Sequence, residues 1–523
     1  MPETRSDRNK PTPFRGPLIA ARWTTRTVGC LVAMVFAASC VSHADNNLSG
    51  EPAEQAPESS LERTVRGEGV FDGETITYTA ALETFDIAGT DDRPAARLSA
   101  FSYVAEKVDE NTQRPVLFVF NGGPISASLW LHIGAVGPKR VSAPDDLSAP
   151  VDAFELVDNT HSPLDVADLV FFDPASTGFS HVVDGGDPSA FFSIEADAAQ
   201  FVDFIEAWLA RHRRDGTPVY ILGESYGTMR AAEAAGQLAE EGGPPPAAGV
   251  FLMGQAVNII EYAQRRQNII SYVVSLPTLA AMGWEQDRVD RKGRNFETFI
   301  AEATKFGETD YLTALFQGNR LEDDELRRIA DKLEEYTGIP ADYYVENRLR
   351  ISKEQYRTEL LRAEGKVLGR SDGRYVGDDP RGDASGILTE AYLKGFKAYL
   401  SSVFDLEIGE EYKTLANVGG LAGWEWGGSS PFSHFDYSVR LNHAFEANPG
   451  FRLLIGNGYH DTMTTVGAAE YLAAQADWPM EQVRLSFYQG GHMAYSIDET
   501  AEAFGNDIRH WVEGSGSWAN GGN

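Results

Sequence analysis

Cysteine is almost absent from this chain of 523 residues, which contains only Cys30 and Cys40. Both lie near the amino terminus, ahead of the region that is expected to fold. Disulfide bonds within that region are therefore excluded, and burial of an apolar core must stabilise it instead. A chain of this length can bury such a core, in one large domain with an insertion or in two domains.

Basic residues are also scarce, because 45 Lys and Arg residues stand against 77 Asp and Glu residues, a formal net charge of −32. This excess of negative charge argues against nucleic acid or an anionic membrane surface as a partner, and solubility alone explains it. The sequence has no cluster of His, Cys and carboxylate residues at the spacing of a zinc or iron site. We therefore expect no metal and no other cofactor.

Apolar runs long enough to span a membrane are missing from the region that is expected to fold. Residues 28–38 form an apolar stretch behind several Arg and Lys residues, too short for a stable span. The pattern predicts an export signal over residues 1–44, with either cleavage after Ala44 or lipidation at Cys40, and a flexible polar linker over residues 45–65. The protein is expected to be periplasmic, secreted or lipid-anchored at the cell envelope, with no transmembrane span in the mature chain.

Strand-like and helix-like segments alternate along the chain. Residues 115–120 and 168–173 are unbroken apolar runs bounded by turn residues, which is typical of strands covered on both faces. Further strands are predicted at residues 75–82, 97–104, 218–222, 249–253, 451–456 and 483–488, and helices at residues 192–212 and 231–240. This alternation predicts an α/β fold with a central, mostly parallel sheet flanked by helices.

The pattern changes to charged helical segments between residues 259 and 447. Helices are predicted there at residues 287–305, 321–336, 351–364 and 390–400. We interpret this block as an inserted, mainly helical cap that divides the core into residues 66–258 and 448–523.

Ser225 is the first candidate for a catalytic residue. It lies in the motif Gly223-Glu224-Ser225-Tyr226-Gly227, between a predicted strand and a predicted helix. This is the pattern of a nucleophile elbow, in which the two glycines let the strand and the helix pass closely and the serine hydroxyl is exposed. The helix that follows favours negative charge developing at its amino terminus.

Two further candidates follow late strands. Asp461 comes after the strand at residues 451–456, and His492 comes after the strand at residues 483–488. In α/β hydrolases the nucleophile, the acid and the histidine occur in this chain order, each at the carboxyl end of its own strand. We expect His492 to accept the Ser225 proton and Asp461 to orient the imidazole. His460 is rejected as the base, because neighbouring residues at a strand end point in opposite directions.

Asn121-Gly122-Gly123-Pro124 follows the predicted strand at residues 115–120. Adjacent glycines at such a position can direct backbone N–H groups toward one point, as in an oxyanion hole. An ordinary Gly-Pro turn is the alternative interpretation of this motif taken alone.

Together these motifs resemble the serine carboxypeptidase family of α/β hydrolases, in particular its bacterial branch. The resemblance rests on residues 121–130, residues 168–180, the Ser225 motif, and the segments around Asp461 and His492. It implies peptide substrates with a free carboxyl terminus, Ser225, Asp461 and His492 as the triad, and the N–H groups of Gly123 and Tyr226 as the oxyanion hole. It also implies that Asn121, Gly122 and Glu224 bind the substrate's terminal carboxylate. A Glu224 side chain that must keep its proton for this purpose favours mildly acidic pH.

The chain departs from the family at two positions near the predicted site. Ile125 replaces a usual glycine, and Ala135 aligns with a second glutamate that assists carboxylate binding in some members. Two other functions stay open: an esterase, acyltransferase or aminopeptidase-like hydrolase on the same scaffold, and a catalytically silent binding protein. Trp424 and Trp426 could line a substrate pocket, although aromatic residues there are more often part of the core.

Overall fold

The computed structural model describes residues 61–90, 92–106, 113–183, 185–240, 245–427 and 436–518. The chain divides into Met1–Ala38, which lies outside these ranges, and Ser39–Asn523, to which the following description refers. The predicted export signal, with Cys40 and Ala44, also lies outside the described residues. Within the described ranges, no helix combines the length and the apolar character needed to cross a membrane.

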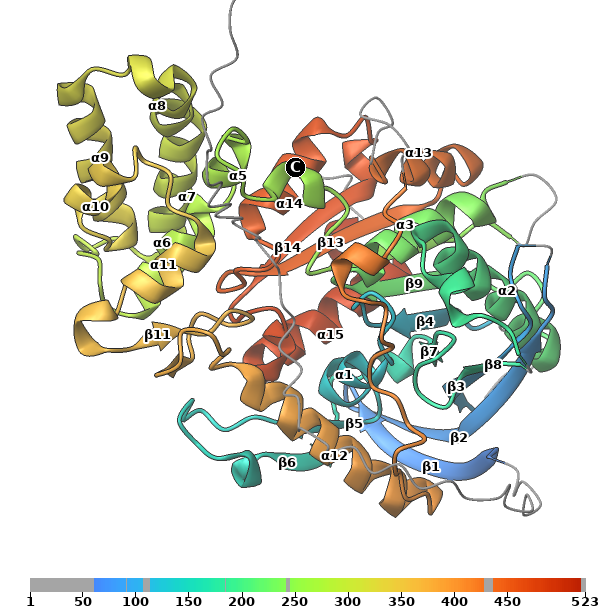
Figure 1. Ribbon diagram of the computed structural model, residues 1–523. Coiled ribbons are helices and arrows are strands. Elements are labelled where there is room, and N and C mark those ends of the chain that lie inside the picture. Colours follow the sequence, from blue (N-terminus) through green and yellow to red (C-terminus); the bar gives the residue numbers. More distant parts are fainter. Residues whose placement is uncertain are drawn as a thin grey trace, which may run out of the picture. The chain divides into compact units, whose positions relative to one another are not determined.

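A ten-stranded sheet forms the centre of the fold, in the order β1-β2-β3-β7-β4-β9-β10-β13-β14, with β8 paired to β3 (Figure 1). Strands β7 to β14 in this order pair in parallel, and β1, β2 and β3 add an antiparallel edge. The strands are β1 Arg63–Phe71, β2 Glu74–Ile87, β3 Ala96–Ala105, β4 Val116–Phe120, β7 Asp168–Asp173, β8 His181–Val182, β9 Val219–Glu224, β10 Gly249–Met253, β13 Arg452–Gly458 and β14 Val483–Tyr488. The predicted α/β-hydrolase class, with its mostly parallel sheet, is confirmed.

The central strands are buried on both faces because apolar side chains occur at every position. In β4, Phe118 and Phe120 join one hydrophobic cluster while Leu117 and Val119 join another, as the alternation of side chains along a strand requires. The first cluster is covered by α2 Ile194–His212, α3 Gly227–Leu238, α13 Ser438–Ala447 and α14 Val466–Gln475. The second is covered by α1 Leu129–Leu131, α12 Gly386–Phe404 and α15 Asp498–Glu513. Helices therefore flank the sheet on both sides (Figure 1).

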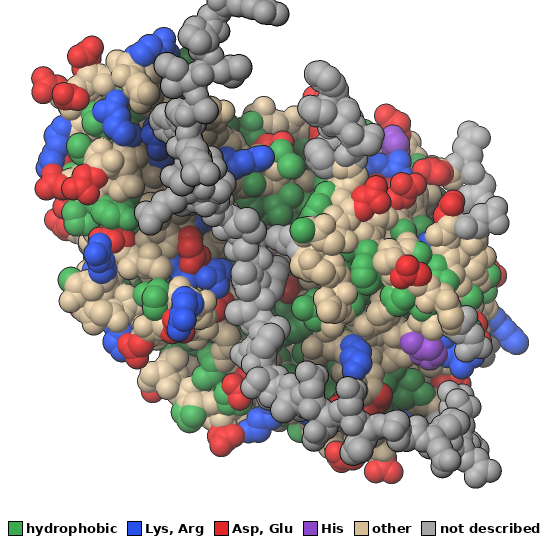
Figure 2. Space-filling view, in the orientation of Figure 1, with side chains coloured by type: hydrophobic (Ala, Val, Ile, Leu, Met, Phe, Trp, Pro, Cys, Tyr) green, Lys and Arg blue, Asp and Glu red, His purple; other side chains and the backbone are tan. Residues whose placement is uncertain are grey.

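Between β10 and β13 a group of helices has a hydrophobic cluster of its own. It comprises α6 Leu276–Glu285, α7 Phe296–Phe306, α8 Leu312–Gln317, α9 Asp323–Thr337, α10 Ala341–Glu346 and α11 Lys353–Glu359, after the short helices α4 Ile259–Tyr262 and α5 Ile270–Val273. Figure 2 shows basic and acidic side chains mixed over this group, and ion pairs such as Arg328–Asp310 at 3.0 Å join them. In contrast, α12 and α13, from the same inserted stretch, pack against the sheet. Two short hairpins complete the described strands: β5 Lys139–Ser142 with β6 Glu155–Asp158, and β11 Val367–Leu368 with β12 Val376–Gly377.

Several predicted boundaries differ from the observed ones, and three of them are described here. The helix predicted over residues 287–305 begins only at Phe296, because the Asn295 side chain caps it by accepting a hydrogen bond from the Thr298 amide at 2.9 Å. The helix predicted over residues 351–364 ends at Glu359. Strand β1 overlaps the last residues of the predicted linker, because Arg63 already pairs with Leu82 of β2.

Candidate active site

Ser225 lies on a sharp turn between β9 and α3. Its φ angle of 61° falls in the left-handed region that non-glycine residues seldom adopt, and its amide donates to the Met253 carbonyl at 2.9 Å. A Cβ atom on Gly223 would lie 2.3 Å from the Gly227 carbonyl oxygen, so only glycine allows the strand and the helix to pass this closely. These are the features of a nucleophile elbow.

The loop after β4 lies directly against this elbow. A Cβ atom on Gly122 would come within 2.5 Å of the Tyr226 nitrogen. The neighbouring Gly123 has a φ angle of +118°, and its bond to Pro124 is cis. The structure therefore places the loop that carries Gly123 against Tyr226, although the two segments are about a hundred residues apart in the sequence.

His492 and Asp461 form a buried pair at the same edge of the sheet. The distance from Nδ1 of His492 to Oδ2 of Asp461 is 2.7 Å. The other oxygen of Asp461 accepts a hydrogen bond from the Met463 amide at 2.7 Å, and the Thr464 hydroxyl donates to Oδ2. A carboxylate held in this way fixes the orientation and the tautomer of the imidazole.

The imidazole of His492 lies beside the end of β10, the strand next to β9. A Cβ atom on Gly254 would be 3.2 Å from Cε1 of His492, and Gly254 follows Met253, whose carbonyl accepts the Ser225 amide. Among the described residues no hydrogen bond joins the Ser225 hydroxyl to Nε2 of His492. In ligand-free enzymes this contact often forms only when substrate binds.

The pKa of His492 reflects two opposing effects. Burial lowers it, but the charge and hydrogen bond of Asp461, together with the Glu224 charge, outweigh burial and raise the pKa above its usual value. His460 differs, since burial lowers its pKa to about 4 and its Nδ1 accepts the Gly490 amide at 3.3 Å. Nδ1 of His460 is therefore engaged by Gly490, whereas the Asp461 carboxylate bonds to His492.

Glu224 and Asn121 lie together beneath the elbow. The Asn121 side-chain amide donates to Oε1 of Glu224 at 2.9 Å, and the Tyr495 hydroxyl donates to Oε2 at 2.6 Å. Asn121 is oriented by the Leu131 amide, which donates to its Oδ1 at 3.1 Å. Burial raises the pKa of Glu224 above its usual value, although His492 and the hydrogen bonds of Tyr495 and Asn121 partly oppose the shift.

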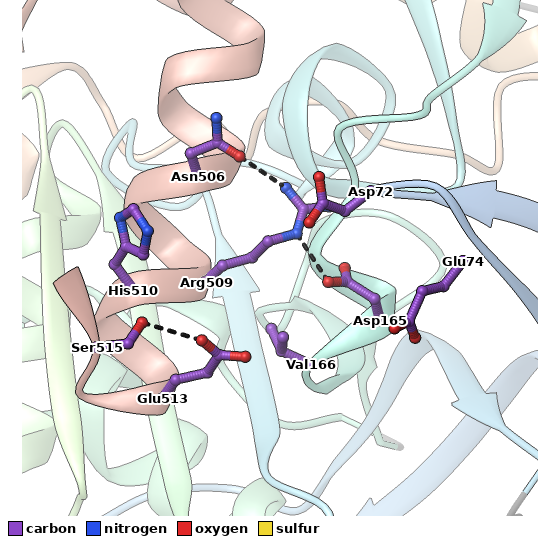
Figure 3. A pocket seen from close by; sticks show the side chains of 9 residues that line it. All are labelled: Asp72, Glu74, Asp165, Val166, Asn506, Arg509, His510, Glu513 and Ser515. Atoms are coloured by element: carbon purple, nitrogen blue, oxygen red, sulfur yellow. Dashed lines mark hydrogen bonds and ion pairs between the residues drawn. The ribbon is translucent and has the colours of Figure 1, made fainter.

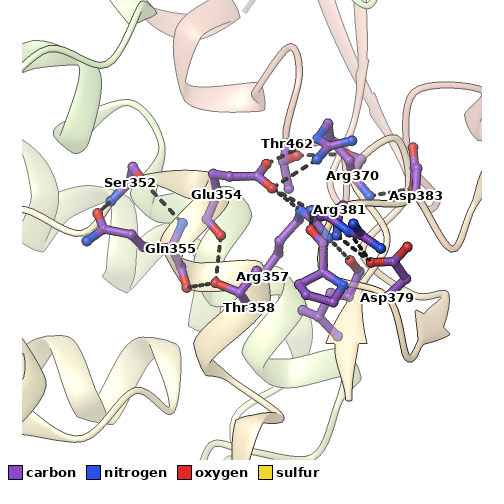
Figure 4. A network of polar contacts seen from close by, with 12 residues as sticks. Ser352, Glu354, Gln355, Arg357, Thr358, Arg370, Asp379, Arg381, Asp383 and Thr462 are labelled. Carbon is purple, nitrogen blue, oxygen red and sulfur yellow. Dashed lines mark hydrogen bonds and ion pairs between the residues drawn. The ribbon is translucent and has the colours of Figure 1, made fainter. Parts of the chain in front are cut away.

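Residues 370–373, from the inserted region, hold the loops that carry Asp461 and His492. The Ser371 carbonyl accepts the His492 amide at 2.6 Å, and the Asp372 carboxylate accepts the Gly491 amide at 3.1 Å. The Arg370 carbonyl accepts the Thr462 hydroxyl at 2.7 Å. Figure 4 shows how Asp383, Glu354 and neighbouring arginines anchor this segment in turn.

Three parts of this arrangement escaped the sequence analysis: Tyr495, residues 370–373, and Lys353. The Lys353 side chain is buried, donates to the Met463 carbonyl at 3.2 Å, and lies 5.2 Å from the ring centre of Tyr262. Of these three, only Tyr495 carried a signal in the sequence, because it lies three residues after the candidate base His492.

Other predicted residues near the site belong to the core. Trp424 is buried, with its ring centre 5.1 Å from that of Tyr226, and Trp426 is partly buried beside it. The Ile125 side chain is fully buried in the same cluster, at a φ angle of 47°. Among the described residues, no group of three or more His, Cys, Asp and Glu side chains is arranged to hold a metal ion.

A separate pocket lies away from these residues (Figure 3). It is lined by the turn between β1 and β2, by the residues before β7, and by the end of α15, with Arg509 donating to Asp165 at 2.8 Å. Since β7 begins at Asp168, the pocket is at the amino end of this strand. Active sites of open parallel sheets lie at the opposite edge.

The serine carboxypeptidase family model matches residues 92–245, a segment that contains Asn121, Gly122, Gly123, Glu224, Ser225 and Tyr226. Over this segment the chain is similar to serine carboxypeptidases. Asp461 and His492 lie outside the matched segment, so their roles depend on the geometry described above.

Several solved structures are similar to this chain. Kex1, a prohormone-processing carboxypeptidase from Saccharomyces cerevisiae, is similar at a TM-score of 0.51 and 15% identity, over 83% of this chain and 91% of Kex1. A proline iminopeptidase from Mycobacterium smegmatis is similar at a TM-score of 0.34 and 14% identity, over 82% of this chain and 98% of the other. At this identity the Kex1 likeness shows a common α/β-hydrolase fold.

Proposed function

We propose that this protein is a serine carboxypeptidase, which removes residues from the carboxyl termini of peptides through an acyl-enzyme on Ser225. The observation that supports this specificity is the buried Glu224 and Asn121 pair beside the elbow. A pair of this kind, next to the nucleophile, suits a substrate whose terminal carboxylate lies one residue from the bond to be cut. The proposed clamp is Asn121, the Gly122 backbone and Glu224.

In the proposed reaction, Oγ of Ser225 attacks the last peptide carbonyl while its proton passes to Nε2 of His492. The N–H groups of Gly123 and Tyr226 stabilise the oxyanion. The C–N bond then breaks, and the departing amino group takes the proton from His492. Water then attacks the ester carbonyl while His492 accepts its proton. When the ester bond breaks, His492 returns the proton to Oγ of Ser225, and the shortened peptide leaves.

The protonation of Glu224 couples substrate binding to this chemistry. Glu224 and His492 each shift the pKa of the other, so they titrate as a pair. One proton shared between them rests either on His492 or on Glu224. The terminal carboxylate of a substrate repels an ionised Glu224 and favours the second form, in which the imidazole is neutral and able to act as a base.

This coupling predicts a mildly acidic preference. At high pH the pair loses its proton, Glu224 is ionised, and peptide affinity falls. At low pH both groups carry a proton, and His492 cannot accept one from Ser225. The protein is further proposed to act outside the cytoplasm, on the basis of the predicted export signal.

A pair of peptides tests the proposal: one with a free carboxyl terminus and its amidated twin. We expect strong preference for the free acid, and loss of trimming in Ser225→Ala without loss of fold by circular dichroism. Equal hydrolysis of the two peptides would favour an esterase or acyltransferase on this scaffold. Trimming by Ser225→Ala would refute the role of Ser225.

A further inference from the structure

Tyr495 stands out as a contact to Glu224 that neither the motifs nor the proposed reaction requires. It lies in a short helix, Ala494–Ser496, three residues after His492, and its side chain has no exposed surface. Its hydroxyl donates to Oε2 of Glu224 at 2.6 Å. This is a short hydrogen bond, as expected when the acceptor carries charge.

The position of the Tyr495 ring is fixed by its surroundings. Its ring centre lies 5.8 Å from that of Phe504 of α15. On another side, a Cβ atom on Gly134 would come within 2.8 Å of the Tyr495 ring, so the absence of a side chain there makes room for it. Gly134 precedes Ala135, which aligns with the second glutamate that some serine carboxypeptidases use beside the residue equivalent to Glu224. The Tyr495 hydroxyl gives Glu224 a partner of different chemistry.

A tyrosine acts on Glu224 differently from a carboxylic acid. Burial raises the pKa of Tyr495 well above its usual value, so its hydroxyl remains a proton donor at any working pH. A fixed donor stabilises the ionised form of Glu224, whereas burial stabilises the neutral form. The other titratable groups that face Glu224 are His492, Asp461 and Tyr392.

The geometry also limits where a proton on Glu224 can point. Each carboxyl oxygen has two lone pairs, and one on each is used by Asn121 or by Tyr495. A proton must occupy a remaining position, directed away from both donors. Loss of either donor leaves the carboxyl group held by one of these two hydrogen bonds instead of both.

We propose that Tyr495 is a positioning residue that holds the Glu224 carboxyl group for the substrate's terminal carboxylate and sets the pH above which that carboxylate is no longer bound. This inference rests on the proposed carboxypeptidase function. In this proposal the Tyr495 hydroxyl stabilises ionised Glu224 against the effect of burial, which favours the neutral form.

Tyr495→Phe tests the inference, with Tyr392→Phe as the matched control. Tyr392 is also fully buried and packs against Gly134, but its hydroxyl has no hydrogen-bond partner among the described residues. The measurement is KM for a free-acid peptide as a function of pH. In Tyr495→Phe we expect the midpoint at which KM rises to move upward by about one pH unit, because one hydrogen bond to the charged form is lost. In Tyr392→Phe it should stay in place.

Two further variants guard against a general structural effect. In Glu224→Gln the side chain at residue 224 no longer titrates, so adding Tyr495→Phe should leave the pH dependence of KM unchanged. Gly134→Ala, which displaces the Tyr495 ring without removing its hydroxyl, should shift the midpoint upward in the otherwise unaltered protein, and it replaces Tyr495→Phe if that variant does not fold.

An unmoved midpoint in Tyr495→Phe, or an equal shift in Tyr392→Phe, overturns the inference. If the wild-type protein still prefers the free acid over the amidated peptide, only the role of Tyr495 is lost. If the wild-type protein is indifferent to the terminal carboxylate, the proposed function fails as well.

Discussion

Asp383→Asn probes how far the inserted region supports catalysis. The Asp383 carboxylate accepts the Arg370 amide at 2.7 Å and the Ser385 amide at 3.0 Å on one oxygen, and the Ser371 amide at 3.1 Å on the other. It thereby fixes residues 370–373, which bond to the loops of Asp461 and His492. The substitution keeps the shape of the side chain but removes its charge and one acceptor oxygen.

The cost follows from this geometry. Whichever way the new amide turns, its NH₂ group faces at least one backbone N–H that has lost its acceptor. Such a half-buried donor, together with the loss of charge, should cost about 2 kcal/mol of stability. Residues 370–373 should then hold His492 less firmly, and kcat/KM should fall roughly 10- to 100-fold, as small misplacements of catalytic groups do.

The assay combines thermal unfolding with the pH dependence of kcat/KM. The Asp383 charge contributes to the raised pKa of His492, so its removal should lower that pKa and move the acidic limb of the profile to lower pH. Asp379→Asn is the control: its side chain is 57% exposed and, among the described residues, accepts hydrogen bonds only from Arg381, so the substitution should change stability by less than about 0.5 kcal/mol. Full kcat/KM in an Asp383→Asn protein of lowered Tm would refute the reasoning, because these residues would then support only the fold.

Two more predictions follow from buried ionisable groups. In Glu224→Gln, KM for a free-acid peptide should become independent of pH in the range where the wild-type KM rises, because an amide donates a hydrogen bond at any pH; a KM profile like that of the wild type would contradict the proposed clamp. Burial lowers the pKa of Lys353 to about 8 from an ordinary value of 10.5, so the folded state disfavours its charge. Its contribution to stability is unfavourable at neutral pH and disappears as pH rises from 8 to 10.5. Lys353→Met should therefore be more stable than wild type at pH 7 by about 1–3 kcal/mol in chemical denaturation, with the gain vanishing toward the upper end of that window. A gain that does not depend on pH would indicate a packing effect instead.

Strands buried on both faces were the part of the fold most open to prediction. The strands predicted at residues 168–173, 249–253 and 483–488 coincide with β7, β10 and β14. Continuous apolar runs between turn residues leave few alternatives for such segments. Helix starts in the inserted region were less predictable, as the helix at Phe296 shows, because charged residues before Asn295 fit a helix as well as a loop.

The order and type of the residues around Ser225 were enough to nominate the elbow, since its geometry depends on neighbours in the chain. The sequence alone also pointed to Asp461 and His492, because local apolar runs predict where strands end, and the order of Ser, Asp and His can be read along the chain. It could not identify the contacts of Glu224 with Tyr495, 271 residues away, or of His492 with Ser371. Such contacts arise only when parallel strands and the inserted region bring distant segments to one edge of the sheet. The sequence therefore determined which groups could react, and the tertiary structure decided which neighbours set their protonation and hold them in place.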